Sequence, residues 1–277
     1  MDYQDVRPKS QAELLFEAQV RKNRRFRLNV ALSWIVLLLI LGLMFSGGGN
    51  LPFGLGGITL DFQFISENWD FIAAGIWSTI GISVLSIILA TLLALIAALG
   101  RLSTFPPFFA LSTFYVSLIR GTPLYLQIFF FFLALPQLGI VLPGMWAGVL
   151  ALGMNYGAYM SEIFRAGIAA VGKGQREAAM ALGMTARQTM QRIVLPQALR
   201  FAIPPTGNEF IAMTKDSALV AATGFVHELM WRATKVGRSN FRNLEALIIA
   251  AVFYWIMTLI LTALQSRLEA RMSRGDR

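Results

Sequence analysis

The stretch "EAAMALGMTARQTMQRIVLPQALR", Glu177–Arg200, is polar and basic, yet it lies between segments apolar enough to enter a lipid bilayer. Its first residues are good helix formers, and Gly183 suits the left-handed position that ends a helix. Thr185 and Gln188 then have the spacing of a capping box for a second helix. We expect this second helix to end at Pro196, because proline lacks the N–H that a helix interior needs. The pattern predicts a short helical hairpin outside the membrane.

The composition of the whole chain is that of a membrane protein. Its 277 residues are 56% hydrophobic and only 14% charged, and the mean hydropathy is +0.60. A soluble domain usually carries about 25% charged residues. With no cysteine and a single histidine, His227, the sequence excludes disulfides, thiolate chemistry and a multi-histidine zinc site, so we expect no bound metal.

Several apolar segments are long enough to cross a bilayer, which takes roughly 20 residues of helix. The fifth of them is conspicuously polar. We therefore predict an all-α integral membrane protein of about six spans, at residues 28–45, 71–99, 108–135, 141–164, 201–225 and 244–264.

The positions of lysine and arginine predict the orientation of these spans. The basic stretch 21–27 precedes the first span, loop 46–70 has neither residue, and the tail 265–277 is basic again. We therefore place both termini and the hairpin in the cytoplasm. Loop 226–243 carries four positive residues and is placed outside, against the rule. The net charge of +9 thus reflects membrane topology rather than a nucleic-acid partner.

The N-terminal segment is the least defined part of this scheme. No small-residue cleavage site follows the first apolar run, so we expect a retained span rather than a signal peptide. Ser10 and Glu13 have capping-box spacing, which favours an interfacial elbow helix about as much as a frayed tail. The predicted domains are an arm at 1–27, an extra span with its external loop at 28–70, a core at 71–264 and a basic tail at 265–277.

The hairpin carries a family resemblance. Glu-Ala-Ala, then Gly183 six residues after Glu177, then Ile193 and Leu195-Pro196, resembles the EAA loop of transmembrane subunits of ABC importers. Further segments make residues 71–264 similar to permease subunits of the polar amino-acid uptake family: "RGTPLYLQIFF" from Arg120, "YMSEIFRAGI" from Tyr159, "GKGQREAAMALGM" from Gly172, "PPTGNEFI" from Pro204 and "TKDSALV" from Thr214. The departures are Gly172, where such proteins usually have proline, and Ser161, where alanine is usual.

The resemblance implies a fold and a set of partners. The fold is a five-span type I importer core with a cytoplasmic coupling helix, preceded here by an extra span. The partners are a dimer of ABC ATPase subunits that holds ATP and Mg²⁺, a second permease subunit (identical or different), an extracytoplasmic solute-binding protein and an amino-acid substrate. The location is a bacterial inner membrane. The residues expected to couple to the ATPase are Lys173, Gln175, Glu177, Ala178, Ala179, Gly183, Ile193, Leu195 and Pro196.

The chain does not carry an ATP site of its own. "GIAAVGKG", residues 167–174, comes within one residue of a Walker A loop, but Gly174 stands where a serine or threonine must hold Mg²⁺. We therefore assign no cofactor to this chain and do not expect it to be an enzyme. An Ala-rich hairpin tethered to a membrane is also a poor reader of a DNA groove.

Polar residues within the predicted spans are candidates for a substrate path, because such groups are expensive at membrane depth. Glu162 is three residues before Arg165, which favours a structural ion pair slightly over substrate contact. The candidate path residues are Asn155, Tyr159, Glu162, Asn208 and Glu209. The residues expected to brace the structure or an interface are Arg120, Pro123, Lys215 and Asp216.

Proline and glycine predict local irregularities in the spans. We expect a break at 120–123 and a short or interrupted helix that starts near Pro204-Pro205. Gly144/Gly148 and Gly153/Gly157 have the small-xxx-small spacing of close helix packing.

Two other functions compete with an ATP-driven amino-acid permease. A secondary carrier driven by an ion gradient would leave the hairpin without a role, and the sequence shows no clear inverted repeat. A membrane enzyme would have little chemistry available, since the HExxH and GxSxG motifs are absent from the sequence.

Overall fold

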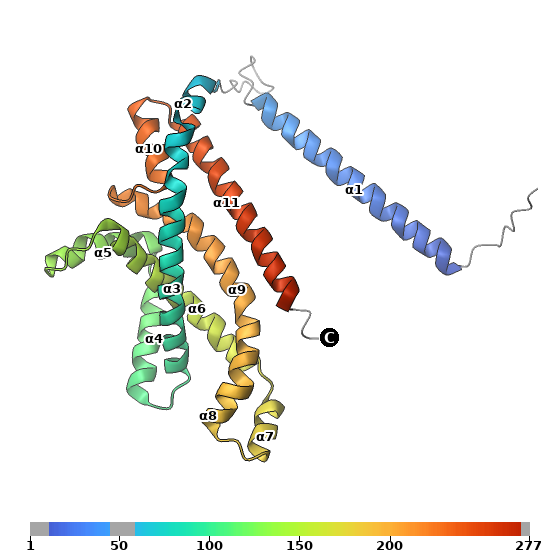
Figure 1. Ribbon diagram of the computed structural model, residues 1–277, viewed down its shortest axis with the longest axis vertical. Helices are drawn as coiled ribbons and strands as arrows, with labels where there is room; N and C mark the ends of the chain where they lie inside the picture. The colour runs from blue at the N-terminus through green and yellow to red at the C-terminus, as the bar shows by residue number, and fades with distance from the viewer. Residues whose placement is uncertain (1–10, 45–58, 273–277) are drawn as a thin grey trace, which may run out of the picture. The chain divides into compact units, whose positions relative to one another are not determined.

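The computed structural model describes residues 11–44 and 59–272, and these are almost entirely helical (Figure 1). The chain divides into two units, Met1–Phe62 and Gln63–Arg277. In the first unit the structure describes residues 59–62 and one long helix, α1 (Gln11–Met44), which runs without a break through the basic stretch 21–27 and the first apolar stretch. Ser10 of the expected capping box lies outside the described residues.

The second unit contains the remaining helices. In chain order these are α2 (Phe62–Ala73), α3 (Gly75–Arg101), α4 (Pro106–Arg120), α5 (Leu124–Gln137), α6 (Gly144–Ala170), α7 (Lys173–Ala181), α8 (Ala186–Thr189), the π-helical turn η1 (Met190–Val194), α9 (Leu195–Asp216), the 3₁₀ turn η2 (Ser217–Thr223), α10 (Leu229–Ser239) and α11 (Asn243–Met272).

Helices α3 and α6 form the centre of this unit, with α9 packed against α6. Small residues make the contact possible: a Cβ atom on Gly153 would lie 2.6 Å from a methyl carbon of Leu89, and one on Gly157 would lie 2.9 Å from Cβ of Leu93. The close packing predicted from the glycine spacing is therefore confirmed here. A side chain at Gly148 would similarly meet Val220 of η2.

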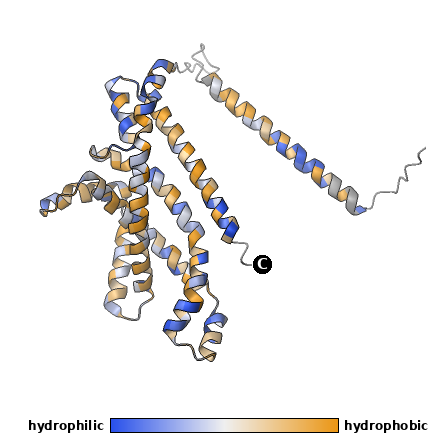
Figure 2. Ribbon diagram, in the orientation of Figure 1, coloured by the Kyte–Doolittle hydropathy of each residue, from blue (hydrophilic) through white to orange (hydrophobic). Residues whose placement is uncertain are grey.

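Several helices have the length and apolar character of membrane spans. Residues 62–101 and α11 are each long and apolar enough to cross a bilayer, and α4 with α5 passes the same test as a pair bent by 107°. This bend confirms the break predicted at 120–123. Figure 2 shows α11 as largely hydrophobic along its length and hydrophilic toward its C-terminal end. The count of six spans stays a prediction.

The predicted hairpin is present, at the end of the unit opposite to α10 (Figure 1). Gly183 has φ +78, and the N–H of Met184 donates to the carbonyl of Ala179 at 3.1 Å, as in a Schellman motif. Thr185 and Gln188 form the predicted capping box in both directions.

The predicted end of the second hairpin helix at Pro196 is wrong. The chain stays helical from α8 through η1 into α9, with Pro196 in the first turn of α9. In η1 the N–H of Leu195 donates to the carbonyl of Met190, five residues back. This wider turn accommodates a proline that an uninterrupted α-helix would exclude.

The helix start predicted near Pro204-Pro205 is also wrong, whereas the predicted interruption of this helix is found further along, after Asp216. Both prolines lie inside α9, which changes to 3₁₀ geometry only after Asp216. Contacts of α9 with α6 and α11 hold the helix across the two missing N–H groups. Gln265 of α11 contributes by donating to the carbonyl of Pro204 at 3.0 Å.

Candidate functional site

A polar hollow of about 370 Å³ lies where the α4–α5 break, α6 and α9 meet. The three elements supply residues far apart in the sequence. We call it the inner hollow, and its lining residues are Thr122, Pro123, Leu124, Asn155, Tyr156, Tyr159, Glu209 and Asp216.

Helical spacing brings these side chains to one place. Asn155 and Tyr159 are one turn apart on α6, and Glu209 and Asp216 are two turns apart on α9, so each pair shares a helix face. The hydroxyl of Tyr156 donates to Oδ2 of Asp216 at 2.7 Å and joins the two helices.

The break between α4 and α5 forms a structured wall of the inner hollow. Nε2 of Gln127 donates to the carbonyl of Ile119 at 2.8 Å and to Oγ1 of Thr122 at 2.8 Å. Nδ2 of Asn155 donates to Oε1 of Gln127 at 3.0 Å. The bend leaves carbonyls without helical partners, and this buried network satisfies them, so the wall is fixed rather than loose.

The charge of the inner hollow is negative. Two of its lining residues are carboxylates, and none of those contributed by the described chain is lysine or arginine. Glu209 accepts no hydrogen bond from any residue that the structure describes. Arg120 lies at the edge, with its guanidinium carbon 5.2 Å from the centre of the Tyr159 ring. The site can therefore bind a cationic group at Glu209 and Asp216, with a positive group close to its rim.

Of the predicted path residues, Asn155, Tyr159 and Glu209 come together in the inner hollow, whereas Glu162 and Asn208 do not line it. Glu162 forms ion pairs with Arg101, with Arg165 at 2.9 Å and with Arg120 at 3.5 Å. Its carboxylate is therefore neutralised by neighbours, which supports the structural interpretation.

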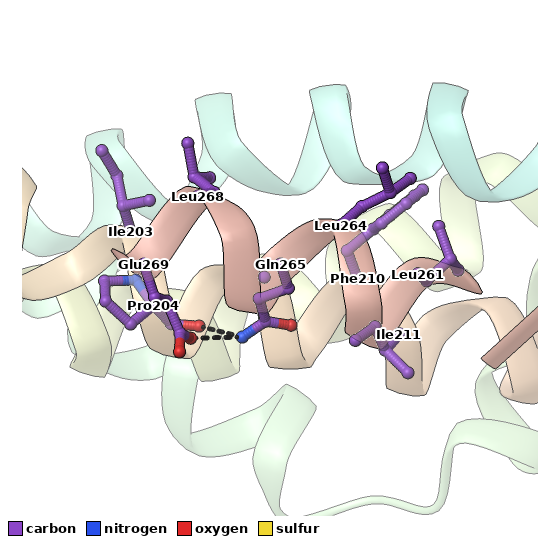
Figure 3. Close-up of a pocket in the computed structure, with 10 residues that line it drawn as sticks. Ile203, Pro204, Phe210, Ile211, Leu261, Leu264, Gln265, Leu268 and Glu269 are labelled. Atoms are coloured by element: carbon purple, nitrogen blue, oxygen red, sulfur yellow. Dashed lines mark hydrogen bonds between the residues drawn. The ribbon is translucent and has the colours of Figure 1, made fainter. Parts of the chain in front are cut away.

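Asn208 points away from the inner hollow, toward α11. Its Oδ1 accepts a hydrogen bond from Nε2 of Gln265 at 3.1 Å. Gln265 lies in a separate, largely apolar hollow of about 260 Å³ between α9 and α11, where it also bonds Pro204 and Glu269 (Figure 3). This second hollow offers little to a polar solute and joins two helices.

Of the residues expected to brace the structure, some line the inner hollow and others do not. Arg120 pairs with Glu162 as a brace would, while Lys215 is exposed. Pro123 precedes α5 and lines the inner hollow. Asp216 lines it too, so sequence reasoning missed it as a candidate path residue. The signal was available, since Asp216 follows Glu209 by seven residues, two turns of one helix.

The hairpin presents most of the predicted coupling residues at its surface. Pro196 and Gly183 are exposed, together with Lys173, Gln175, Glu177 and Ala178, whereas Ile193 and Leu195 are half-buried. Ala179 is 3% exposed. Ala179 is one of the residues expected to couple to the ATPase, but the hairpin folds over its side chain, so Ala179 is not presented at the surface.

The tip of the hairpin is apolar as well as exposed. Met180 is 58% and Leu182 83% exposed. Beside Ala178, these side chains give the tip a small hydrophobic surface that the hairpin itself leaves uncovered. Exposed apolar groups gathered in this way are typical of a docking surface.

The base of the hairpin is attached to the helices that line the inner hollow. Val194 and Ala198 pack against Ile168 and Val171 at the end of α6. Arg176 donates to the carbonyl of Ile168 at 2.5 Å. A displacement of the hairpin would therefore act directly on α6 and α9.

Comparison with known proteins gives the chain its family. Residues 90–274 match the family described as the binding-protein-dependent transport system inner membrane component. The chain belongs to this family. It is 41% identical over 220 residues to the arginine transport system permease protein ArtQ of Bacillus subtilis, covering 79% of this chain and all of ArtQ. It is 40% identical to the L-cystine transport system permease protein TcyB of the same organism, covering 81% and 97%.

Solved structures agree with this assignment. An amino acid ABC transporter crystallised with histidines has a chain with a TM-score of 0.73 and 38% identity, covering 77% of this chain and 99% of that one. A chain of the methionine ABC transporter MetNI, at 17% identity and a TM-score of 0.63, shares the fold. This chain is thus an all-α permease subunit of an ATP-driven importer, embedded in a membrane, and neither an enzyme nor a secondary carrier.

Proposed function

We propose that this chain is the permease subunit of an importer of amino acids with cationic side chains. The observation that carries the proposal is the inner hollow, which offers the carboxylates Glu209 and Asp216 and no lysine or arginine among its lining residues in the described chain. The names of the relatives include transporters of arginine, L-cystine and glutamine. Among these substrates, arginine best fits two carboxylates.

The geometry of the inner hollow supports this substrate class. Asp216 already accepts a hydrogen bond from Tyr156, whereas Glu209 accepts none from the described residues. A guanidinium group has five donors in a planar fork and is the best partner for a carboxylate in a partly dry site. Glu209 is therefore the residue that we expect to contact the substrate's cationic end.

Transport would be coupled to ATP through the hairpin. The exposed tip, with Ala178, Met180 and Leu182, would dock in a groove of a partner ATPase, with Glu177 making a polar contact. ATP and Mg²⁺ would be bound by that partner. Because the base of the hairpin packs on α6 and α9, closure of the ATPases would move two of the three walls of the inner hollow.

The working assembly would contain a second permease subunit, two ATPase subunits and an extracytoplasmic solute-binding protein. In this arrangement the hairpin and both termini lie in the cytoplasm of a bacterial cell. The end of the second unit that carries α10 then lies outside.

The test is ATP-dependent uptake by the permease, reconstituted in liposomes with its partner ATPase and solute-binding protein. We expect uptake of radiolabelled L-arginine in preference to L-glutamine. Glu209→Gln should raise the KM for arginine about tenfold or more, since it removes a charge-assisted hydrogen bond of about 1.5–3 kcal/mol. The control is Asn208→Ala, on another face of α9. Uptake without ATP, or equal arginine KM values for wild type and Glu209→Gln, would contradict the proposal.

A further inference from the structure

A third hollow, of about 650 Å³, opens between α10, the 3₁₀ turn η2 and the start of α5. We call it the outer hollow. Three alanines of η2 make one wall, and the side chains of Trp231, Lys235 and Arg238 of α10 make another, with Tyr125 of α5 completing the lining. The alanine wall leaves room for a small molecule.

The outer hollow is positive where the inner hollow is negative. Trp231, Lys235 and Arg238 follow one another at spacings of four and three residues, so they share a face of α10. Nζ of Lys235 lies 4.8 Å from the centre of the Trp231 ring. None of the lining residues in the described chain is acidic, and neither cation is ion-paired there. Two positive groups are thus left available for an anion.

The helix that carries these cations is held firmly. Glu228, which is fully buried, accepts hydrogen bonds from the N–H groups of Met230 and Trp231 at 2.9 and 2.6 Å and from the hydroxyl of Tyr254 at 2.7 Å. Arg232 donates to the carbonyl of Phe71 at 3.1 Å. Because α10 is fixed to α2 and α11, the two cations occupy a defined place rather than a loose loop.

The outer and inner hollows adjoin. Leu124 lines the inner hollow and the next residue, Tyr125, lines the outer one. Likewise Asp216 lines the inner hollow, and Ala218, two residues on, lines the outer one. The first residues of η2 and α5 therefore separate a positive compartment from a negative one.

We propose that the outer hollow is a subsite for the α-carboxylate of the transported amino acid, bound by Lys235 and Arg238 before the cationic end enters the inner hollow. The inference rests on the proposed function and orientation. It explains why this loop carries positive charge on the side where the topology rule disfavours it. A carboxylate attracted by two cations in a concave site is also concentrated there. The position of the outer hollow beside the inner hollow favours a small zwitterion over an acidic loop of a docked protein.

Trp231 provides a local probe for the test. The assembled permease–ATPase complex is labelled with 5-fluorotryptophan, and the Trp231 resonance is identified by its loss in Trp231→Phe. L-arginine and L-arginine methyl ester, which lacks the carboxylate, are then titrated separately, with and without a non-hydrolysable ATP analogue. We expect a saturable shift with arginine in at least one nucleotide state, and about tenfold weaker binding of the ester.

Charge variants assign the effect to the two cations. Lys235→Gln with Arg238→Gln should weaken arginine binding to the level of the ester, while Lys235→Arg with Arg238→Lys should restore the difference. Arg267→Gln with Arg271→Gln removes the same charge from exposed positions of α11 and should change nothing.

Three results would overturn the subsite: no shift at Trp231, equal shifts with arginine and its ester, or a shift only when the binding protein is added, which would indicate protein docking. Each of these can occur while ATP-dependent arginine uptake persists, so failure of the subsite is distinguishable from failure of the proposed function.

Discussion

Three carboxylates on α6 and α9 have different roles because their partners differ. Glu162 is surrounded by three arginines, Asp216 accepts one hydrogen bond from Tyr156, and Glu209 accepts none from the described residues. An ionised group away from water needs a partner. Glu162 is therefore satisfied without substrate, whereas Glu209 has no such partner among the described residues and is the carboxylate left to contact a cationic ligand.

Sequence alone could bring Asn155, Tyr159 and Glu209 forward as candidates, because each is polar within an apolar span. It could not separate Glu209 from Glu162. The partners Arg101 and Arg120 lie 61 and 42 residues away from Glu162 along the chain, and only the packing of α3, α4 and α6 brings them together. The local partner, Arg165, was visible from spacing alone.

Gly172 offers a test of how the backbone sets the hairpin. Its φ of −52 and ψ of 142 suit proline, the preceding residue is extended, and a Cβ atom there meets nothing within 4 Å. Gly172→Pro should therefore stabilise the hairpin by about 0.4–1 kcal/mol, by restricting the unfolded chain. Hydrogen exchange of the α7 amides should slow about two- to fivefold.

The matched control for Gly172→Pro is Gly183→Ala. Gly183 has φ +78, where an alanine side chain is strained by about 1 kcal/mol. Exchange of the same amides should become faster. Faster exchange in Gly172→Pro would show that the N–H of Gly172 makes a contact that the hairpin needs.

At the scale of elements, the helix boundaries predicted from the sequence were wrong where the chain forms irregular helical turns. Prolines predicted a helix end at 196 and a helix start near 204–205, yet the chain is helical from Ala186 to Thr223, with a π-helical turn near one end and a 3₁₀ turn at the other. The turns that sequence did predict, at Gly183 and Thr185, depend on local hydrogen bonds. Those it missed depend on packing against α6 and α11, which no local pattern records.

Helix α10 depends on one buried carboxylate, which makes its stability sensitive to pH. Burial raises the pKa of Glu228, and hydrogen bonds from Met230, Tyr254, Trp231 and Thr79 offset part of that effect. With a folded-state pKa above the unfolded value of about 4.3, this group favours folding most at low pH. That contribution is lost as pH rises through the raised pKa.

Comparison with Glu228→Gln isolates this effect. The free energy of unfolding of the wild type minus that of Glu228→Gln should fall as pH rises from about 4.3 to the raised pKa, and level off above it. Thermal unfolding of the purified complex at several pH values measures the difference. A difference that grows with pH in this window would show that the hydrogen bonds outweigh burial.

At the scale of the whole molecule, α3, α6 and α9 join the two ends of the second unit (Figure 1). One end carries the hairpin and the other carries α10 (Figure 1). The outer hollow is lined in part by α10, and the inner hollow, of opposite charge, is lined by the α4–α5 break, α6 and α9. An importer needs its solute entrance and its ATPase-docking surface at opposite ends, because solute must enter at the end away from the ATPase. This arrangement serves import only if the two ends lie on opposite sides of the membrane.

Because the sequence contains no cysteine, single-cysteine variants can test on which side of the membrane each end lies, without labelling of native thiols. Ser239→Cys places one thiol at the end of α10, and Gly174→Cys places one at the start of the hairpin; both positions are exposed. In intact spheroplasts a membrane-impermeant maleimide should label Ser239→Cys and not Gly174→Cys. In inside-out vesicles the pattern should reverse, and both should react in detergent. Labelling of Gly174→Cys from outside would invert the orientation and would also remove the outer hollow from the entry side, because the hairpin and α10 belong to the same compact unit.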